Sequence, residues 1–230
     1  MDHPLMLLVW ILEKLHLGDF AHAYPHVVYS WFFIIVLVVA GRLAVSKLTL
    51  VPGRAQNVAE VIVEQIAAFQ EGLMGPKGRS FFPFMATLII FVFVCNFNGL
   101  VPGSTSPTSN LNTTLALAII IVATTHITGI RHHGFKYIKH FLGPAPFLAP
   151  LMFPVEVISH LARLLSLSLR LFGNIMGEDL VITVLFFLGG AFFILPLPMM
   201  FLGLFTGFLQ SFVITLLAML YISEALAHSH

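Results

Sequence analysis

Residues 155–189 read VEVISHLARLLSLSLRLFGNIMGEDLVITVLFFLG. Most of this segment consists of Leu, Ile, Val and Phe, as expected for a segment that lies in lipid, yet it carries five charged side chains. The charged residues are Glu156, Arg163, Arg170, Glu178 and Asp179. A charged side chain at membrane depth costs about 3 kcal/mol or more on insertion scales, and such residues usually mark ion pathways or proton relays. The segment therefore predicts a membrane helix with a transport function.

The polar and small residues of this segment recur at intervals of three, four and seven positions. They are Glu156, Ser159, His160, Arg163, Ser166, Arg170, Gly173, Asn174, Gly177 and Glu178. On a helix, such intervals place side chains on one face, and the remaining faces are apolar. At 1.5 Å per residue, the segment forms a helix of about 52 Å, whereas the hydrocarbon core is about 30 Å thick. A single helix of this length must therefore lie steeply tilted or break.

The composition of the whole chain indicates the same environment. Of its 230 residues, 58% are apolar and 9% are charged, whereas a soluble domain carries about 25% charged residues. So few charges cannot cover a soluble surface, and a net charge of +1 produces no field that attracts polyanions. These values exclude a soluble enzyme, a disordered segment and a nucleic-acid-binding protein, and they predict an integral membrane protein.

The gaps between charged residues locate the membrane helices. No Asp, Glu, Lys or Arg occurs between Ser80 and Ile130, or between Leu180 and Ser223. Each gap accommodates two helices of about 20 residues, and turn-forming residues divide the first gap at 102–110. We therefore expect an all-α integral membrane protein, with one domain over residues 1–230 and about five membrane helices. The expected helices are 24–44, a hairpin of 81–101 and 111–130, and two long, tilted helices at 155–189 and 199–223.

Two further segments have the pattern of helices outside the membrane core. In residues 54–73 the apolar side chains fall on one helical stripe and the glutamates lie elsewhere, which predicts an interfacial helix on the cytoplasmic side. Residues 1–23 predict an amphipathic arm on the outer side. Ala21-His22-Ala23 has the pattern of a signal-peptidase site, whereas Asp2 and Glu13 disfavour a signal peptide. Retention of the arm is therefore the preferred alternative.

Basic residues in the short loops set the expected orientation, because loops rich in Lys and Arg stay on the cytoplasmic side. Residues 42–79 contain five of them and residues 131–139 contain three, whereas residues 102–110 contain none. With five membrane helices, the N-terminus then lies outside and the C-terminus lies in the cytoplasm.

Arg170 stands out among the charged residues. A guanidinium stays protonated, so it cannot pass a proton onward, but it can hold a nearby carboxylate in its ionised form. That carboxylate belongs either to another subunit or to an internal pair in the bundle, and spacing alone favours neither. In the last helix, Gly203, Gly207 and Gln210 share one face, and small residues let two helices approach closely. Together the two polar faces predict a water-filled path.

Ser166-Leu167-Ser168-Leu169-Arg170-Leu171-Phe172-Gly173-Asn174 resembles the arginine motif of subunit a of the F-type ATP synthase. Further matches follow in the order of that family. They are Val51-Pro52-Gly53, Asn96 ahead of Leu100-Val101-Pro102, Asn112-Thr113-Thr114-Leu115, Pro154-Val155-Glu156 and Leu209-Gln210-Ser211-Phe212. The resemblance covers residues 24–224, and the arginine motif is its most specific part.

The resemblance implies the stator ion channel of a rotary ATP synthase. Two half-channels would carry protons or sodium ions to and from a membrane-embedded carboxylate of the c-subunit ring, which couples ion flow to ATP synthesis. The implied partners are the c ring, the b subunits of the peripheral stalk, the rest of the ATP synthase and the lipid of the bacterial inner membrane. The chain itself would be a non-catalytic subunit without nucleotide chemistry, cofactor, metal site or nucleic-acid partner.

The resemblance also assigns roles to residues. Arg170 would keep the ring carboxylate ionised and prevent a direct leak between the half-channels. The inlet half-channel would contain Asn174, Glu178, Asp179 and Gln210, and the exit half-channel would contain Glu156, Ser159 and His160. Some relatives carry a histidine at the position of Gly203 and a small residue at that of Glu178, so Glu178 would replace that histidine across the facing helices. Many relatives carry an acidic residue at the position of Asn110. This chain has no carboxylate at that position, so the loop would not supply one to ion entry.

Other functions fit parts of the sequence. A stand-alone ion channel or secondary transporter would also carry intramembrane charges. A haem-binding electron-transfer protein would need two histidines at membrane depth, and only His126 and His160 qualify. These two are either relays or packed side chains, and packing is the preferred interpretation. An intramembrane protease is disfavoured, because neither His-Glu-x-x-His nor Gly-x-Ser-x-Gly occurs.

Overall fold

The computed structural model describes residues 18–45, 49, 53–101, 104–134, 149–189 and 194–227 of the chain. The predicted arm of residues 1–23 is described only in its last part, as helix α2 (Gly18–Ala23). The rest of that arm and the loop residues Lys47, Lys136 and Lys139 lie outside the described residues.

Five segments in the described part of the chain are long and apolar enough to cross a membrane. They are α3 (Pro25–Ala44), α5 (Phe82–Asn98) with the 3-10 helix Pro76–Phe81 before it, α6 (Leu111–His133), α8 (Ala149–Gly189) and α9 (Leu197–Ala227). One further long helix, α4 (Arg54–Met74), lies between α3 and α5, and the described residues contain no strand. The expected all-α membrane protein with five membrane helices is therefore confirmed.

Local sequence signals explain where several helices begin and end. Pro25 opens α3 and Pro83 lies in the first turn of α5, where the missing proline N–H would have had no helical partner. Asn110 caps α6, because its side chain accepts a hydrogen bond of 2.9 Å from the backbone N–H of Asn112. Gly75 ends α4 with a φ of 62°, a left-handed conformation that favours glycine.

The end of α5 differs from the sequence expectation. The helix ends at Asn98, whereas the expected membrane segment continued to residue 101. The Asn98 side chain donates a hydrogen bond of 2.9 Å to the Thr105 carbonyl and accepts one of 2.8 Å from the Ser104 hydroxyl. These bonds stabilise the turn that follows the helix, at the expense of a further helical turn.

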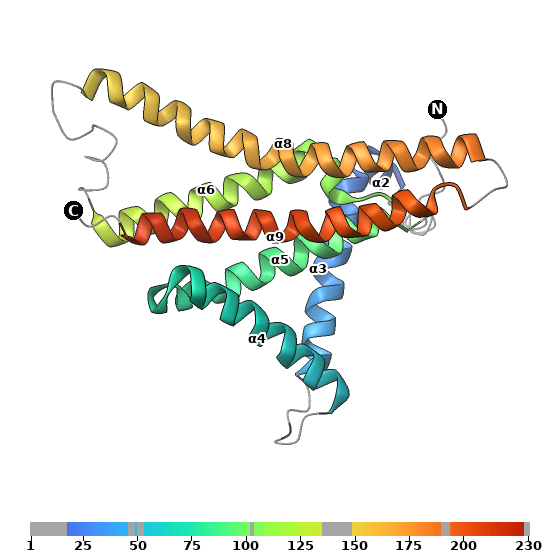
Figure 1. Cartoon of the computed structure of the whole chain (residues 1–230), viewed down its shortest axis with the longest axis horizontal. Coiled ribbons are helices and arrows are strands. Elements are labelled where there is room, and N and C mark those ends of the chain that lie inside the picture. Colours follow the sequence, from blue (N-terminus) through green and yellow to red (C-terminus); the bar gives the residue numbers. More distant parts are fainter. Residues whose placement is uncertain are drawn as a thin grey trace.

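The two C-terminal helices are much longer than the membrane is thick. The 41 residues of α8 make a helix of about 61 Å, and the 31 residues of α9 make one of about 46 Å. Since α8 is continuous and holds Pro154 without ending, tilt rather than breakage fits it to a core of about 30 Å. Both helices extend beyond the expected bounds of 155–189 and 199–223. Figure 1 shows α6, α8 and α9 running in one general direction, with α3 lying across them.

Helices α5, α6, α8 and α9 share one apolar core. Its buried side chains include Val92, Ile121, Leu167, Leu171, Ile214 and Met219. Many other large apolar side chains point outward, and Phe187 of α8 is the extreme case, being 87% exposed. A soluble protein rarely exposes contiguous apolar surface on this scale. The outward apolar surface therefore suits contact with lipid or with other membrane subunits.

Helix α4 packs on this core through only part of its apolar stripe. Phe69 contacts Phe212 of α9 with ring centroids 4.8 Å apart, and Leu73 also packs against the core. Nearer the start of the helix, Val58 and Ile62 are exposed. An amphipathic helix with an uncovered apolar side suits a membrane surface. In Figure 1, α4 lies on the side of the molecule away from α8.

Candidate functional site

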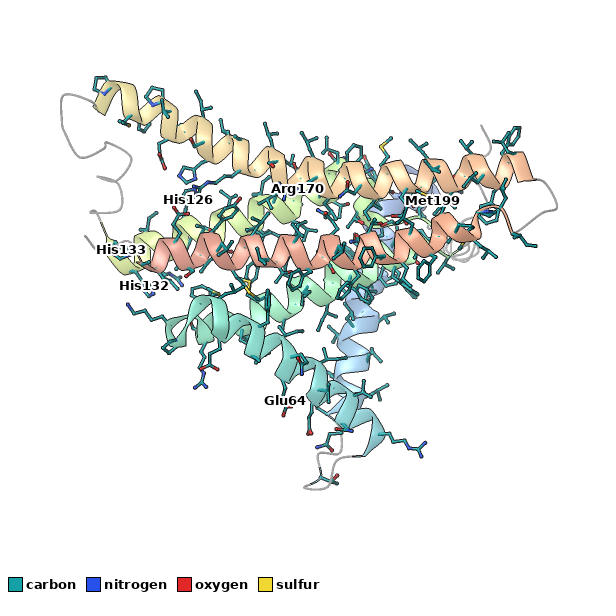
Figure 2. The ribbon with its side chains drawn as sticks, viewed as in Figure 1. Glu64, His126, His132, His133, Arg170 and Met199 are labelled. Carbon is teal, nitrogen blue, oxygen red and sulfur yellow. The ribbon has the colours of Figure 1, made fainter. Side chains whose placement is uncertain are left out.

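Arg170 lies near the middle of α8 (Figure 2), and its side chain is exposed. Its Nη2 donates a hydrogen bond of 3.3 Å to the hydroxyl of Ser166, one turn earlier. Within the described ranges, no carboxylate lies within ion-pair distance of the guanidinium. The internal ion pair that the sequence left open as an alternative is therefore not formed by the described residues.

Small residues continue this exposed face towards the C-terminal end of α8. Gly173 and Gly177 lie one and two turns beyond Arg170, and a Cβ added at either would meet no neighbouring atom within 4 Å. Both positions are exposed, as is Asn174 between them. A face of small residues lets another helix approach closely, so Arg170 lies on a surface open to a partner.

Asn174 connects this face to α9. Its Nδ2 donates a hydrogen bond of 3.0 Å to Oε1 of Gln210. Gln210 is only 4% exposed, and its Nε2 has no hydrogen-bond partner among the described residues. A buried amide that lacks an acceptor costs free energy, so this N–H group is available to a water molecule or to a polar group of the path.

Glu178 points from α8 into the contact with α9. Oε2 of its carboxylate accepts a hydrogen bond of 2.9 Å from the hydroxyl of Thr206, and the side chain is 8% exposed. A Cβ added at Gly203 would overlap with the Glu178 carboxyl group. Glu178 thus occupies the volume that a side chain at position 203 would need. It does not share the exposed face of Arg170, although the sequence periodicity placed both on one stripe.

Asp179 faces the loop between α5 and α6. The 3-10 helix Pro107–Ser109 of this loop packs against α8, and the Ser109 hydroxyl itself donates a hydrogen bond of 2.7 Å to the Ser106 carbonyl. A Cβ added at Gly99 would lie 2.8 Å from Oδ1 of Asp179. The loop residue Asn110 caps α6. The loop therefore places hydroxyl groups next to Asp179.

A chain of buried hydrogen bonds fixes this loop to α5 and α9. Ser106 and Thr108 share a hydrogen bond of 2.7 Å, and the Thr108 hydroxyl donates one of 2.7 Å to Oδ1 of Asn96. Asn96 in turn donates a bond of 3.0 Å to the Gly207 carbonyl of α9. Sequence reasoning treated residues 102–110 only as a turn. The signal for this network is the density of hydroxyl side chains in the loop beside an asparagine of an apolar helix.

A second cluster lies on the other side of Arg170, near the start of α8. His160 Nε2 is 3.3 Å from Oε1 of Glu156, one turn earlier. The ring of His160 also contacts that of His126 on α6, with ring centroids 4.6 Å apart. Two imidazoles in direct contact leave no room for a porphyrin between them, so this pair does not have the geometry of axial haem ligands. Ser159 precedes His160 and is half-buried.

Arg163 joins this cluster to α9. Its Nη1 is 3.2 Å from Oε2 of Glu224, and its guanidinium lies 5.1 Å from the centre of the Tyr221 ring. Arg163 therefore pairs with a carboxylate of α9 rather than with one of α8. Sequence reasoning missed Glu224, although it is the first charged residue after the long uncharged gap.

The predicted site residues thus form two groups rather than one continuous line. Asn174, Glu178, Asp179 and Gln210 lie on one side of Arg170, and Glu156, Ser159 and His160 lie on the other. Along α8, Arg170 is about 12 Å from Glu178 and about 21 Å from Glu156. Within the described ranges, no group of three or more His, Cys, Asp or Glu residues could hold a metal ion.

Comparison with known proteins gives a consistent result. The model of the family described as ATP synthase A chain matches residues 27–223. ATP synthase subunit a of Citrifermentans bemidjiense is 50% identical over 231 residues, and that of Syntrophobacter fumaroxidans is 48% identical over 241 residues. The alignments cover 100% of this chain and 100% of each relative. The chain therefore belongs to the ATP synthase A chain family, that of ATP synthase subunit a.

Proposed function

We propose that this chain is the stator ion channel of a bacterial rotary ATP synthase, in which two half-channels carry ions to and from the carboxylates of a c-subunit ring. The observation that carries this function is the position of Arg170. Its guanidinium is exposed, has no carboxylate partner in the described part of the chain, and separates two polar clusters. A charge placed in this way needs a partner from another subunit.

Arg170 would control the charge of the ring carboxylate. A guanidinium remains protonated at any accessible pH, and an opposite charge within about 4–6 Å favours the ionised form of a carboxylic acid. A ring carboxyl group that arrives at Arg170 would therefore release its ion before it moves on. The hydrogen bond to Ser166 helps to orient the guanidinium along the exposed face.

The inlet half-channel would consist of the cluster around Asp179 and Glu178. Asp179 lies beside the hydroxyl-rich loop, Glu178 lies between α8 and α9, and Asn174 and Gln210 lie closest to Arg170. This order offers oxygen and amide groups in steps of about one turn, or 5.4 Å. An ion could pass through this series with few bound water molecules before it reaches the ring.

The exit half-channel would begin on the opposite side of Arg170 and include Ser159, His160 and Glu156. The two clusters are separated along α8 by about 33 Å between Glu156 and Glu178. Leu167 and Leu171 are fully buried between them. With apolar packing beneath and a fixed positive charge on the surface, the ring carboxylate would be the only carrier between the clusters, which couples ion flow to rotation.

The surroundings of the chain follow from the same proposal. The c ring would pack on the exposed face of Arg170, Gly173 and Gly177, and the b subunits and the remaining subunits would complete the enzyme. The protein would lie in the bacterial inner membrane with the N-terminus outside and the C-terminus in the cytoplasm. The basic loops and the bacterial origin of the relatives support this orientation and location. Helix α4 would then lie on the cytoplasmic surface.

A test of partner dependence separates this function from that of a stand-alone channel or secondary transporter. The chain purified in mild detergent is expected to carry c and b subunits with it, and the isolated chain in vesicles is expected to transport neither protons nor sodium. The assembled complex should pump ions when given ATP. Ion transport by the isolated chain at the rate of the complex would contradict the stator function.

A further inference from the structure

His126 and His160 form a contact pair of which the proposed exit half-channel uses only His160. His126 comes from α6 and His160 from α8, so the contact joins two membrane helices at 4.6 Å between ring centroids. Both side chains are at most half-exposed. Ionisable side chains at membrane depth cost free energy, and they usually mark an ion pathway or a proton relay.

The groups around the pair form a connected series. Nε2 of His160 is 3.3 Å from the Glu156 carboxylate on α8. Arg163 of α8 and Glu224 of α9 also face the pair, but they are bound to each other at 3.2 Å, and Tyr221 covers the guanidinium. The positive charge of Arg163 is thereby largely balanced. Glu156 is the carboxylate that lies in direct contact with His160.

The position of the pair suits an exit path that leads away from Arg170. His160 lies about 15 Å along α8 from Arg170, and His126 lies about 10 Å along α6 from His133 at the end of that helix. His133 in turn contacts the Ala225 carbonyl near the end of α9. The pair therefore lies between the central arginine and the basic end of α6, as Figure 2 shows for Arg170, His126 and His133.

We propose that His126 and His160 form a proton relay in the exit half-channel, and that this relay makes the exit half-channel selective for protons. The proposal rests on the stator function, since it needs an exit half-channel. In the direction of exit, His126 passes a proton to His160, and His160 releases a proton from Nε2 to the Glu156 carboxylate, which lies farther from Arg170 along α8. Each imidazole gains a proton at one ring nitrogen and loses one from the other, so its charge is restored and its tautomer is inverted; a flip of the ring restores the tautomer before the next passage. The reverse order serves ATP-driven pumping.

The chemistry of the pair explains the selectivity. An unperturbed imidazole titrates at about pH 6.5, which makes it suited to repeated proton exchange near neutral pH. Hard cations such as sodium prefer oxygen ligands such as carboxylate, carbonyl and water. Beyond the Glu156 carboxylate, the pair offers two imidazole rings and a balanced guanidinium, which supply few further oxygen ligands. A sodium ion would have to pass this point with its water shell, whereas a proton can be handed from group to group.

The test uses the whole ATP synthase complex in vesicles. Variants H126Q, H160Q and the double variant keep polar side chains but cannot exchange protons. The double variant is expected to lower the rate of ATP-driven acidification roughly tenfold and to flatten its dependence on pH between about 6 and 8. H132Q is the matched control, because His132 is an exposed histidine at the end of α6. It should pump as the unaltered complex does.

Three results keep this proposal distinct from the stator function. A wild-type rate and pH profile in the double variant would overturn the relay while leaving the stator function intact. A wild-type complex that pumps only with sodium, and that forms no pH gradient without it, would overturn the proton selectivity. If the double variant does not assemble, H126Q and H160Q provide the test. Partial recovery of their pumping rate on adding free imidazole would support the relay. Unaltered pH profiles in both single variants would contradict the relay.

Discussion

At the residue scale, glycines determine how closely polar side chains can approach the neighbouring helices. At Gly99 an added Cβ would lie 2.8 Å from the Asp179 carboxylate, and at Gly203 it would overlap with that of Glu178. Neither glycine is required by a left-handed backbone, since the positive φ angles in the described residues occur at Gly75 and Gly134. The glycines are therefore needed for space rather than for conformational freedom.

This steric relation predicts the behaviour of a pair of substitutions. G203H alone should lower ATP-driven pumping strongly, because the new side chain and Glu178 compete for one volume and overpacking costs about 1–3 kcal/mol. The double variant G203H/E178G exchanges the positions of the two groups and should recover much of the rate. Pumping by vesicles that contain the assembled complex measures both. G41A is the control, since a Cβ there meets no atom within 4 Å.

A double variant that pumps no better than G203H would show that Glu178 and Gly203 do not act as a pair. Wild-type pumping by G203H itself would remove the steric argument.

At the element scale, the loop between α5 and α6 acts as a fixed wall beside the C-terminal half of α8. Ser106 and Thr108 are buried, and the Ser106 hydroxyl also lies 2.8 Å from the Cys95 carbonyl oxygen of α5. The 3-10 helix Pro107–Ser109 packs against α8. A loop held by this many bonds keeps Ser109 at a constant position relative to Asp179.

The prediction at this scale concerns T108V. Valine has nearly the shape of threonine, but it leaves Oδ1 of Asn96 without the donor that it has now, at a cost of about 1–3 kcal/mol. In the detergent-solubilised T108V complex, this chain should therefore unfold at a lower temperature than in the native complex, as measured by thermal unfolding. T108S should behave as the native protein, because it retains the hydroxyl.

T87V provides the comparison, because the Thr87 hydroxyl is exposed and bonds only to the Pro83 carbonyl within its own helix. Equal thermal stability of T108V and T87V would show that the loop network contributes nothing to the fold.

The sequence predicts the elements much better than their contacts. Uncharged gaps locate five membrane helices, because lipid requires long apolar segments whatever their neighbours are. Periodicity shows which side of α8 is polar, but it cannot show that Glu178 turns towards Thr206 while Arg170 stays exposed. Contacts such as Arg163 with Glu224 join residues 61 positions apart. Such contacts depend on how the helices are oriented relative to one another, and the local spacing of residues carries no information about that orientation.

At the scale of the whole molecule, Arg170 divides α8 into two functional halves. The half towards Gly189 carries Glu178 and Asp179 next to a hydroxyl-rich loop, and the half towards Ala149 carries Glu156 and His160, with His126 of α6 and a balanced ion pair beside them. A tilt of α8 in the membrane would let its two halves face opposite sides. A single helix can thus supply both half-channels, with one fixed charge between them.

The most direct test of this account is ATP synthesis by the R170A complex in vesicles on which an ion gradient is imposed. Synthesis should fall to the background rate, because the ring carboxylate would no longer be held ionised between the two half-channels. R79A serves as control, since Arg79 pairs with Glu71 on the exposed surface at 3.6 Å and its loss should leave synthesis unchanged. ATP synthesis by the assembled R170A complex at the native rate would contradict the central role of Arg170.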